Sequence, residues 1–308
     1  MNATTKRFTI TEYIGIWFKA ARAPFLVTSA IPAMLGGIIA YSHGSFDWTI
    51  FLLAFLGIIA AHSAADFIDD YFDYKNGNFA NKDQQFHDSP LVRGIITDKQ
   101  VMQGFLICLA LALASGIYIF FAVGMPVLIL TALGAFIVFF YTSPPIRLNF
   151  RGLGETSLFL AFGPMVVFGV YFVLTQSFNW SPILASVPVG VFVMNVGIVS
   201  NIFDHDDDVK NGKFTMPVKI GQARAVQILT VITVFAYLFL IACALSGFLP
   251  IWSLITLLTA PMSFKMLMLT RNYKNLSQYQ PAMSMAIGVA SLGGLLIMLG
   301  YAISILTQ

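Results

Sequence analysis

Three long stretches of the chain carry no charged side chain: residues 105–123, 225–247 and 282–306. Each is long enough to cross the hydrocarbon core of a bilayer as a helix, which takes about 20 apolar residues. Of the 308 residues, 58% are hydrophobic and only 10% are charged, whereas a soluble domain carries roughly 25% charged residues. The sequence therefore predicts an all-α, polytopic membrane protein and excludes an ordinary soluble domain.

The pattern of apolar runs predicts nine transmembrane helices packed as a bundle. Their expected ranges are about 14–41, 48–68, 101–123, 125–142, 156–176, 181–201, 224–247, 250–270 and 282–306. Pro24 and Pro32 predict a kink in the first span. No separate soluble domain is recognisable, so we expect one integral-membrane domain over residues 1–308, with halves of about 1–142 and 143–308.

Basic side chains fall on one side of such a bundle. With nine spans, all 17 Lys and Arg residues lie on or next to the side that holds the N-terminus, and the opposite loops hold none. Cytoplasmic loops carry an excess of Lys and Arg. We therefore expect the N-terminus and a polar cap in the cytoplasm, the C-terminus outside, and a location in the cell membrane.

Acidic side chains gather in two similar segments on that same side. They are DFIDDYFDYKNGNF at 66–79 and DHDDDVKNGKF at 204–214, and both contain Lys-Asn-Gly. Four expected crossings separate them, which returns the chain to the side from which it started. Either segment alone could have no functional role, because aspartates that follow a span often belong to a solvated loop.

Helical spacing stacks carboxylates in both segments. Asp66, Asp70 and Asp73 share one helix face, and Asp204 and Asp208 share another. Stacked carboxylates close to a bilayer are costly unless cations bind them. Mg²⁺ prefers carboxylate, water and phosphate oxygens, and no His or Cys cluster accompanies the acids, which disfavours zinc. We therefore predict that these five side chains bind Mg²⁺, or Mn²⁺ in its place.

A metal-bound diphosphate at the mouth of an apolar bundle points to prenyl transfer. Metal ions stabilise the departing diphosphate. The allylic carbon left behind becomes a carbocation, which aromatic faces can stabilise, and the chain contains 29 Phe. The predicted catalytic residues are Asp70, Asp73, Asp204 and Asp208.

Further polar residues on the same side are candidates for binding the substrates. Lys75, Arg93 and Lys213 could add positive charge to the phosphates, and Gly77 and Gly212 could let the backbone approach closely. The predicted substrate-binding residues are Arg22, Asp66, Lys75, Arg93, Tyr141, Arg147, Asn201 and Lys213.

Three polar residues have competing interpretations. His62 lies inside a span, where it is either functional or a buried histidine satisfied by a backbone carbonyl. Asn195 is expected to bond another helix. Glu155 opens a span, where a carboxylate favours the helix dipole without any further role.

The acidic segments resemble the two aspartate motifs of the UbiA superfamily of intramembrane prenyltransferases, usually written NDxxDxxxD and DxxxD. DDYFDYKNG at 69–77 takes the place of the first motif, with Asp69 where Asn is usual and Gly77 where a third Asp often stands. DHDDD at 204–208 matches the second. The resemblance covers essentially the whole chain.

Other segments are similar to the branch of that family that prenylates 1,4-dihydroxy-2-naphthoate in menaquinone synthesis. They are YTSPPIRLNFRGLGE at 141–155 and FGP at 162–164. DSPLVRG at 88–94 is similar to the family's DRPLxSG segment, with Ser89 in place of Arg. The resemblance implies a nine-helix fold and transfer of a polyprenyl group from polyprenyl diphosphate to an aromatic acceptor, most directly that naphthoate.

Other functions remain open. A UbiA-type enzyme could use 4-hydroxybenzoate, homogentisate or a glycerophosphate lipid as acceptor, and a cyclase would need no second substrate. A membrane transporter is the alternative from another class, although transporters place their ion sites near the bilayer midplane. We expect a lipid bilayer around the protein and no nucleic-acid partner. Chain length of the donor, oligomeric state and protein partners are not predicted.

Overall fold

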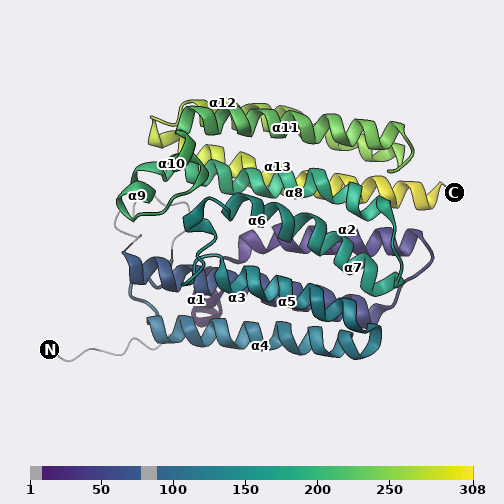
Figure 1. Ribbon diagram of the computed structural model, residues 1–308, viewed down its shortest axis with the longest axis horizontal. Helices are drawn as coiled ribbons and strands as arrows, with labels where there is room; N and C mark the ends of the chain where they lie inside the picture. The colour runs from purple at the N-terminus through teal and green to yellow at the C-terminus, as the bar shows by residue number, and fades with distance from the viewer. Residues whose placement is uncertain (1–8, 78–88, 308) are drawn as a thin grey trace.

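The computed structural model describes residues 9–77 and 89–307, and every regular element within them is helical (Figure 1). The long helices run side by side along one axis, from α4 on one side of the molecule to α11 and α12 on the other. Their bounds are α2 Val27–Ser42, α3 Trp48–Asn76, α4 Asp98–Val123, α5 Met125–Phe140, α6 Gly154–Leu160, α7 Val166–Thr175, α8 Trp180–Phe203, α11 Gln222–Leu245, α12 Ala260–Arg271 and α13 Tyr279–Leu306. The predicted all-α bundle is confirmed.

Eight helical stretches among the described residues are long and apolar enough to cross a membrane. They are Ala23–Ser42, Trp48–Asn76, Asp98–Val123, Gly154–Thr175, Trp180–Phe203, Gln222–Leu245, Ile251–Arg271 and Leu276–Leu306. The remaining predicted span, 125–142, is α5, which has 16 residues. At 1.5 Å per residue it is about 24 Å long, less than a hydrocarbon core of about 30 Å. Helix length alone therefore does not establish the predicted count of nine.

The first predicted span, 14–41, is wrong at its beginning. The helix α1, Ile10–Ala20, is separate from α2, and Arg22 between them has a left-handed backbone with φ 45°. A short 3₁₀ turn, η1 (Ala23–Leu26), then leads into α2. Pro24 explains the break, because proline has no backbone N–H to donate to the last turn of α1 and is tolerated only at the start of a helix, where it stands in η1.

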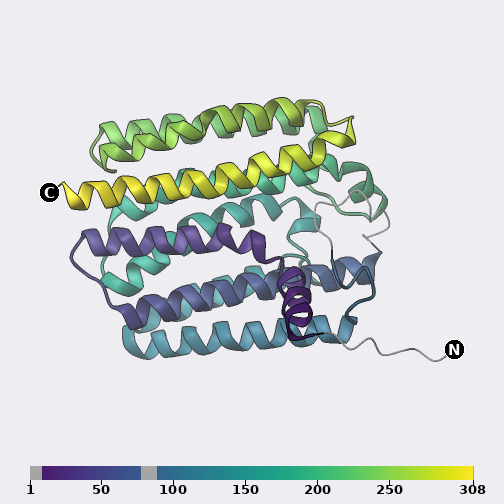
Figure 2. The same ribbon diagram turned by 180° about the vertical axis from the view of Figure 1, so that it is seen from behind.

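The helix α1 lies across the bundle rather than along it (Figure 2). Trp17 packs edge-on against Phe67 of α3, with ring centroids 5.9 Å apart. Ile10 and Ile14 on α1 are exposed, as expected for side chains that face lipid. This docking brings Arg22, which follows α1, against the acidic part of α3.

Gly77 and Gly212 end the helical part of the two acidic segments. Both have positive φ, 78° and 65°, and a Cβ added at either position would meet nothing within 4 Å. Open space beside both glycines leaves the predicted approach of the backbone to a phosphate as a prediction. A left-handed glycine after the last helical turn stops a helix, so the shared Lys-Asn-Gly is a helix-ending signal.

Short helices and loops form a polar cap at the end of the bundle opposite the C-terminus (Figure 1). This cap contains α9 (His205–Lys210) and α10 (Met216–Ile220). The backbone N–H of Phe214 donates to the carbonyl of Phe150 at 3.1 Å, and Lys219 Nζ donates to the carbonyl of Arg151. These bonds tie the segment after α8 to the connection between α5 and α6.

The helix α8 packs against α6, α11 and α13 and forms the centre of the bundle. A π-helical turn, η4 (Ala161–Met165), joins α6 to α7 and crosses α8 closely. A Cβ on Gly163 would lie 3.0 Å from the Cα of Gly190, so this crossing requires glycine. Wide π turns often occur at functional sites, and this one lines the cavity described next.

Candidate active site

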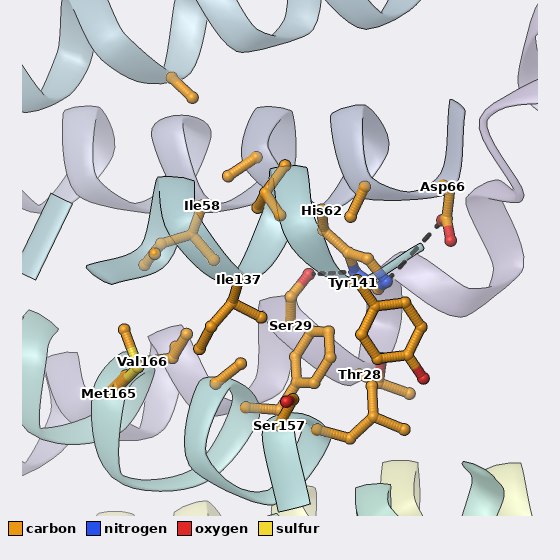
Figure 3. Close-up of a pocket in the computed structure, with 18 of the residues that line it drawn as sticks. Thr28, Ser29, Ile58, His62, Asp66, Ile137, Tyr141, Ser157, Met165 and Val166 are labelled. Atoms are coloured by element: carbon orange, nitrogen blue, oxygen red, sulfur yellow. Dashed lines mark hydrogen bonds and ion pairs between the residues drawn. The ribbon is translucent and has the colours of Figure 1, made fainter. Parts of the chain in front are cut away.

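A cavity of 480 Å³ extends from the acidic segments into the bundle. The side chains around its polar end are Arg22, Asp66, Asp69, Asp73, Tyr141, Asn201, Asp204, Lys213 and Tyr279. Apolar side chains of α3, α4, α5 and α7 line the remainder. In Figure 3, Asp66 and Tyr141 lie toward one side of the view and Ile58 and Val166 toward the other. The predicted polar mouth and apolar body are thus parts of one space.

Arg22 is surrounded by carboxylates of α3. Its Nη2 donates to Asp70 Oδ1, and its Nη1 lies 3.3 Å from Asp69 Oδ2 and 3.9 Å from Asp66 Oδ1. The second oxygen of Asp70 accepts from Ser89 Oγ at 2.9 Å. Asp70 is only 2% exposed, so burial of this charge depends on these partners.

The second acidic segment is held by hydroxyl groups. Asp204 directly follows α8 and accepts from Ser200 Oγ at 2.9 Å and from the Tyr279 hydroxyl at 3.1 Å. Asp208 is 5% exposed and accepts from Thr215 Oγ1 at 3.0 Å. Burial raises the pKa of Asp204, and it raises the pKa of Asp208 to about 7.

Lys213 lies between the two segments. Its Nζ is 3.6 Å from Asp208 Oδ1. Burial lowers the pKa of this ammonium group, but the charges of Asp208 and Asp73, together with those of Asp69 and Asp204, raise it above its ordinary range. Lys213 is therefore protonated at neutral pH and electrostatically links both clusters, which the sequence interpretation expected to face each other.

The carboxylates suit a hard cation in their chemistry. Asp66 Oδ2 and Asp69 Oδ1 are buried without a hydrogen-bond partner among the described residues, and both residues line the cavity. Oxygen-only ligands are those that Mg²⁺ prefers. No group of three or more His, Cys, Asp or Glu side chains in the described part of the chain is arranged to hold an ion. Side chains must therefore turn before three carboxylates share one cation.

Three predicted substrate-binding residues do not line the cavity. Lys75 Nζ lies 2.5 Å from Asp98 Oδ2 on the outside of α3. Lys75 follows Asp73 by two residues, and a side chain at that spacing points to another face of the helix. Arg93 is exposed beyond the cavity wall. The guanidinium of Arg147 lies over the ring of Phe150, 5.2 Å from its centroid.

The other predicted substrate-binding residues do line it: Arg22, Asp66, Tyr141, Asn201 and Lys213. Among the predicted catalytic residues, Asp73 and Asp204 line the cavity, whereas Asp70 and Asp208 are buried outside its lining and contact Arg22 and Lys213, which do line it. Two further residues lie outside the part of the chain that the structure describes. They are Lys82, in the connection after the second predicted span, and Asp88, the first residue of the DSPLVRG segment.

The three residues with competing interpretations have definite partners. His62 Nδ1 bonds Ser29 Oγ at 2.9 Å, and its Nε2 is 3.8 Å from Asp66 (Figure 3). Of the two interpretations of His62, the one with a backbone carbonyl partner is therefore wrong in its partner, which is a hydroxyl group. Asn195 donates to Thr233 of α11 at 2.9 Å, which confirms its bond to another helix. Glu155 is not a simple helix-dipole residue, because it accepts from Asn201 Nδ2 at 2.9 Å.

Sequence interpretation missed several side chains at the polar end. Tyr279 comes from the start of α13, and Ser200 and Thr215 from the helix and loop around Asp204. Hydroxyl residues are common in spans and loops, so nothing in the sequence marked these three. Asp69 did carry a signal, because it precedes Asp73 by one helical repeat.

Similarity to known proteins agrees with this geometry. Residues 29–290 match the model of the UbiA prenyltransferase family. A 1,4-dihydroxy-2-naphthoate octaprenyltransferase of Bacillus subtilis is 24% identical over 246 residues, which cover 80% of this chain and 79% of that protein. A 2-carboxy-1,4-naphthoquinone phytyltransferase of Synechocystis sp. is 29% identical over 228 residues, 72% of each chain.

Solved structures share the fold at low sequence identity. The apo structure of a UbiA homologue from Aeropyrum pernix K1 superposes with a TM-score of 0.68 at 16% identity, covering 90% of this chain and 97% of that one. A homologue from Archaeoglobus fulgidus, bound to DMAPP and Mg²⁺, gives 0.54 at 15% identity, covering 90% and 98%. The family match spans most of the chain and the fold agrees with it, so the protein belongs to the UbiA prenyltransferase family and is a prenyltransferase of the membrane.

Proposed function

We propose that the protein transfers a polyprenyl group from polyprenyl diphosphate to a ring carbon of an aromatic acceptor, with 1,4-dihydroxy-2-naphthoate as the favoured acceptor. The observation that carries this proposal is the continuity of the cavity, whose one end holds carboxylates and cations and whose body is apolar. A diphosphate needs the first environment and an isoprenoid tail needs the second. A single substrate that has both parts fits this space.

The diphosphate end is assigned to the two acidic segments. Asp66, Asp69 and Asp73 on α3, with Asp204 and Asp208 across the cavity, would hold Mg²⁺. The bound ion supplies positive charge that stabilises the diphosphate as it leaves. Arg22 and Lys213 already stand among these carboxylates. Their donors would serve the phosphate oxygens of a bound diphosphate.

The isoprenoid tail is assigned to the space between α3, α4 and α5. Small residues from all three helices line it, among them Gly57, Gly116 and Gly134. A Cβ added at Gly134 would meet nothing within 4 Å, so its missing side chain leaves open space, whereas Gly57 and Gly116 let the three helices pack closely against Ser115 and Thr131. The walls exclude water from the allylic carbon, which favours attack by the acceptor ring over hydrolysis.

The acceptor is assigned to the side of the cavity formed by Tyr141 and Asn201. Burial, followed by the charge of Asp69, raises the pKa of Tyr141, so its phenol remains a hydrogen-bond donor at neutral pH. The names of the two relatives from Bacillus and Synechocystis support a naphthalene-derived acceptor. We place the polar end of the cavity on the cytoplasmic side of the cell membrane.

The test is product analysis with purified protein. Geranylgeranyl diphosphate is offered with a panel of acceptors that includes the naphthoate, 4-hydroxybenzoate, homogentisate and a glycerophosphate lipid, and products are identified by mass spectrometry. We expect a prenylated naphthalene product with Mg²⁺ and none in excess EDTA. A product with another acceptor would replace the naphthoate, and full turnover in EDTA would refute the metal site.

Variants in the second acidic segment make this test specific. Asp204→Asn keeps the size of a side chain that lines the cavity and removes its charge, so we expect kcat to fall by about two orders of magnitude or more. Asp206→Asn is the matched control. Its side chain is 86% exposed only two residues away, and turnover should stay near that of the unmodified protein. Equal activity of both variants would place the diphosphate elsewhere.

A further inference from the structure

Glu155 is a buried carboxylate that joins three separate segments of the polar cap. It is 4% exposed and belongs to the first turn of α6. Its Oε1 accepts from Asn201 Nδ2 of α8 at 2.9 Å and from the backbone N–H of Met216, the first residue of α10, at 3.2 Å. A carboxylate used only to favour a helix dipole would not need such partners. Glu155 does not itself line the cavity.

The bond to Glu155 determines which way the amide of Asn201 faces. An ionised carboxylate only accepts hydrogen bonds, and an amide donates through nitrogen and accepts through oxygen. The Nδ2 of Asn201 must therefore face Glu155, and its Oδ1 points away from it. Because Asn201 lines the cavity although it is only 7% exposed, that oxygen is the part of the amide presented to a ligand.

The surroundings of this oxygen suit a hydroxylated ring. The ammonium group of Lys213 lines the same polar end and can only donate, and the protonated hydroxyl of Tyr141, which also lines it, can donate its proton to an acidic substituent or a phosphate. The oxygen of Asn201 supplies the opposite function, because it accepts. Nearby, Asn149 Oδ1 and Glu155 Oε2 are buried without partners among the described residues. The protein alone therefore does not complete the hydrogen bonding of this wall.

We propose that Glu155 is a positioning residue that holds Asn201 with its amide oxygen toward the cavity, and that this oxygen accepts a hydrogen bond from a ring hydroxyl of the aromatic acceptor. The inference rests on the proposed function and names the chemical group of the acceptor that is recognised. It requires an acceptor with a free hydroxyl on the ring, and it assigns Asn201 to the acceptor rather than to the diphosphate.

A double-mutant cycle tests whether Glu155 acts through Asn201. Asn201→Leu removes the accepting oxygen, and Glu155→Met removes the carboxylate at similar length and frees the amide to turn. Each variant should raise the KM for the acceptor about tenfold, the equivalent of one lost hydrogen bond. The double variant should be no worse than Asn201→Leu alone, because residues that act as a unit are not additive. The KM for the diphosphate donor should change far less.

An exchanged pair provides a rescue. Asn201→Asp places a second carboxylate against Glu155, and we expect repulsion and a raised KM for the acceptor. Adding Glu155→Gln to that variant restores a hydrogen bond, because the new amide nitrogen at position 155 donates to the new carboxylate at position 201. The other carboxylate oxygen at position 201 then faces the cavity as an acceptor. The combined variant should recover most of the acceptor affinity lost in Asn201→Asp. The recovery also shows that the variants fold.

Asn195→Leu is the matched control. Asn195 is a fully buried amide on the same helix that donates to Thr233, and it does not line the cavity. Its loss should leave both KM values unchanged. If Asn201→Leu raised the KM for the donor or the Mg²⁺ requirement instead, Asn201 would serve the diphosphate and the proposal would be wrong. Full additivity of Glu155→Met with Asn201→Leu would also overturn it.

The unmodified protein separates this inference from the function on which it rests. If it prenylates no hydroxylated aromatic compound in the panel, the proposed function fails, and the assignment of Asn201 to such an acceptor fails with it. If it does prenylate one and the Asn201 and Glu155 variants keep its KM, only the assignment of these two residues is refuted.

Discussion

At the scale of single residues, the charge balance of the cavity depends on Arg22. Its guanidinium contacts three carboxylates of α3. Few other side chains could do so, because the planar guanidinium carries five N–H donors that can bind several oxygens at once. The left-handed backbone at this position directs the side chain back toward α3. Arg22 therefore supplies the counter-charge for these three carboxylates in this structure.

Removing Arg22 should destabilise the protein strongly. Arg22→Ala leaves buried carboxylates without a counter-charge, which typically costs about 3–5 kcal/mol. Lys75→Ala removes an exposed ion pair, whose side chains are 46% and 32% exposed, and should leave the stability almost unchanged because solvent screens the pair. Thermal unfolding in detergent with EDTA measures both. We expect Mg²⁺ to recover part of the loss in Arg22→Ala only, and equal midpoints for the two variants would contradict this charge balance.

Asp208 should make the stabilising effect of Mg²⁺ depend on pH. Burial raises the pKa of Asp208 to about 7, although Lys213 lowers it, whereas the unfolded chain releases this proton near pH 4. Without a cation, the contribution of Asp208 to stability is therefore full below about pH 4 and is lost as the pH rises through 7. A cation needs the ionised carboxylate and competes with its proton.

The increase in unfolding temperature caused by Mg²⁺ should accordingly be larger at pH 8 than at pH 6. Asp208→Asn removes the competing proton, so this variant should show a smaller difference between the two pH values. An equal effect of Mg²⁺ at pH 6 and pH 8 in the unmodified protein would show that proton and cation do not compete at Asp208.

Residue spacing predicted part of this site and could not predict the rest. The helical repeat placed Asp66 and Asp73 on one side of α3, where both line the cavity, because that relation is local, but the third carboxylate that lines it is Asp69 and not Asp70. Tyr279 reaches Asp204 across 75 residues, and such a contact exists only after α8 and α13 have packed. The same holds for Arg22, whose contacts follow from the docking of α1.

At the scale of elements, most helices lie where the apolar runs predicted them, because a membrane requires long uninterrupted stretches of such residues. The misplaced boundaries have local causes. Pro24 separates α1 from α2, and α3 continues to Asn76 beyond its predicted end at 68, where polar residues extend the helix out of the apolar region. The wide turn η4 left no mark in hydropathy, since all its residues are apolar or small.

The middle of α5 should limit the length of the donor tail. Gly134 lines the cavity, and a Cβ added there would meet nothing within 4 Å. Gly134→Leu therefore fills the cavity without a clash of backbone, and turnover of geranylgeranyl diphosphate should fall relative to dimethylallyl diphosphate. Gly15→Leu, in open space on α1 away from the cavity, should leave this ratio unchanged. A ratio unaffected by Gly134→Leu would move the tail to another part of the bundle.

At the scale of the whole molecule, polar connections gather at one end and apolar helices make up the body. The sequence interpretation foresaw this division from the positions of 17 basic residues. It could not foresee how the connections bond each other, as Phe214 does with Phe150, because hydrogen bonds between distant loops leave no periodic pattern. The predicted orientation of the bundle in the membrane rests on charge alone and can be tested directly.

Single cysteines should show that both acidic segments lie on the cytoplasmic side. Cysteines at Asn76 and Asn211, in a background without Cys108 and Cys243, should be blocked by a thiol reagent that reaches only the cytoplasmic face. A cysteine at Ser246, between α11 and the segment that follows it, should be blocked only from the opposite face. Asn76 and Asn211 on opposite faces would break the predicted topology.

The position of Arg22 in the chain also bears on how the protein is made. Its acidic partners follow it by only 44 to 48 residues, within the next two helices. Synthesis proceeds from the N-terminus, and early segments can fold before later ones exist. The first helical hairpin can therefore neutralise its own carboxylates while the ribosome is still translating, long before Lys213 emerges. These three carboxylates of α3 therefore do not have to wait for later segments of the chain before they are compensated.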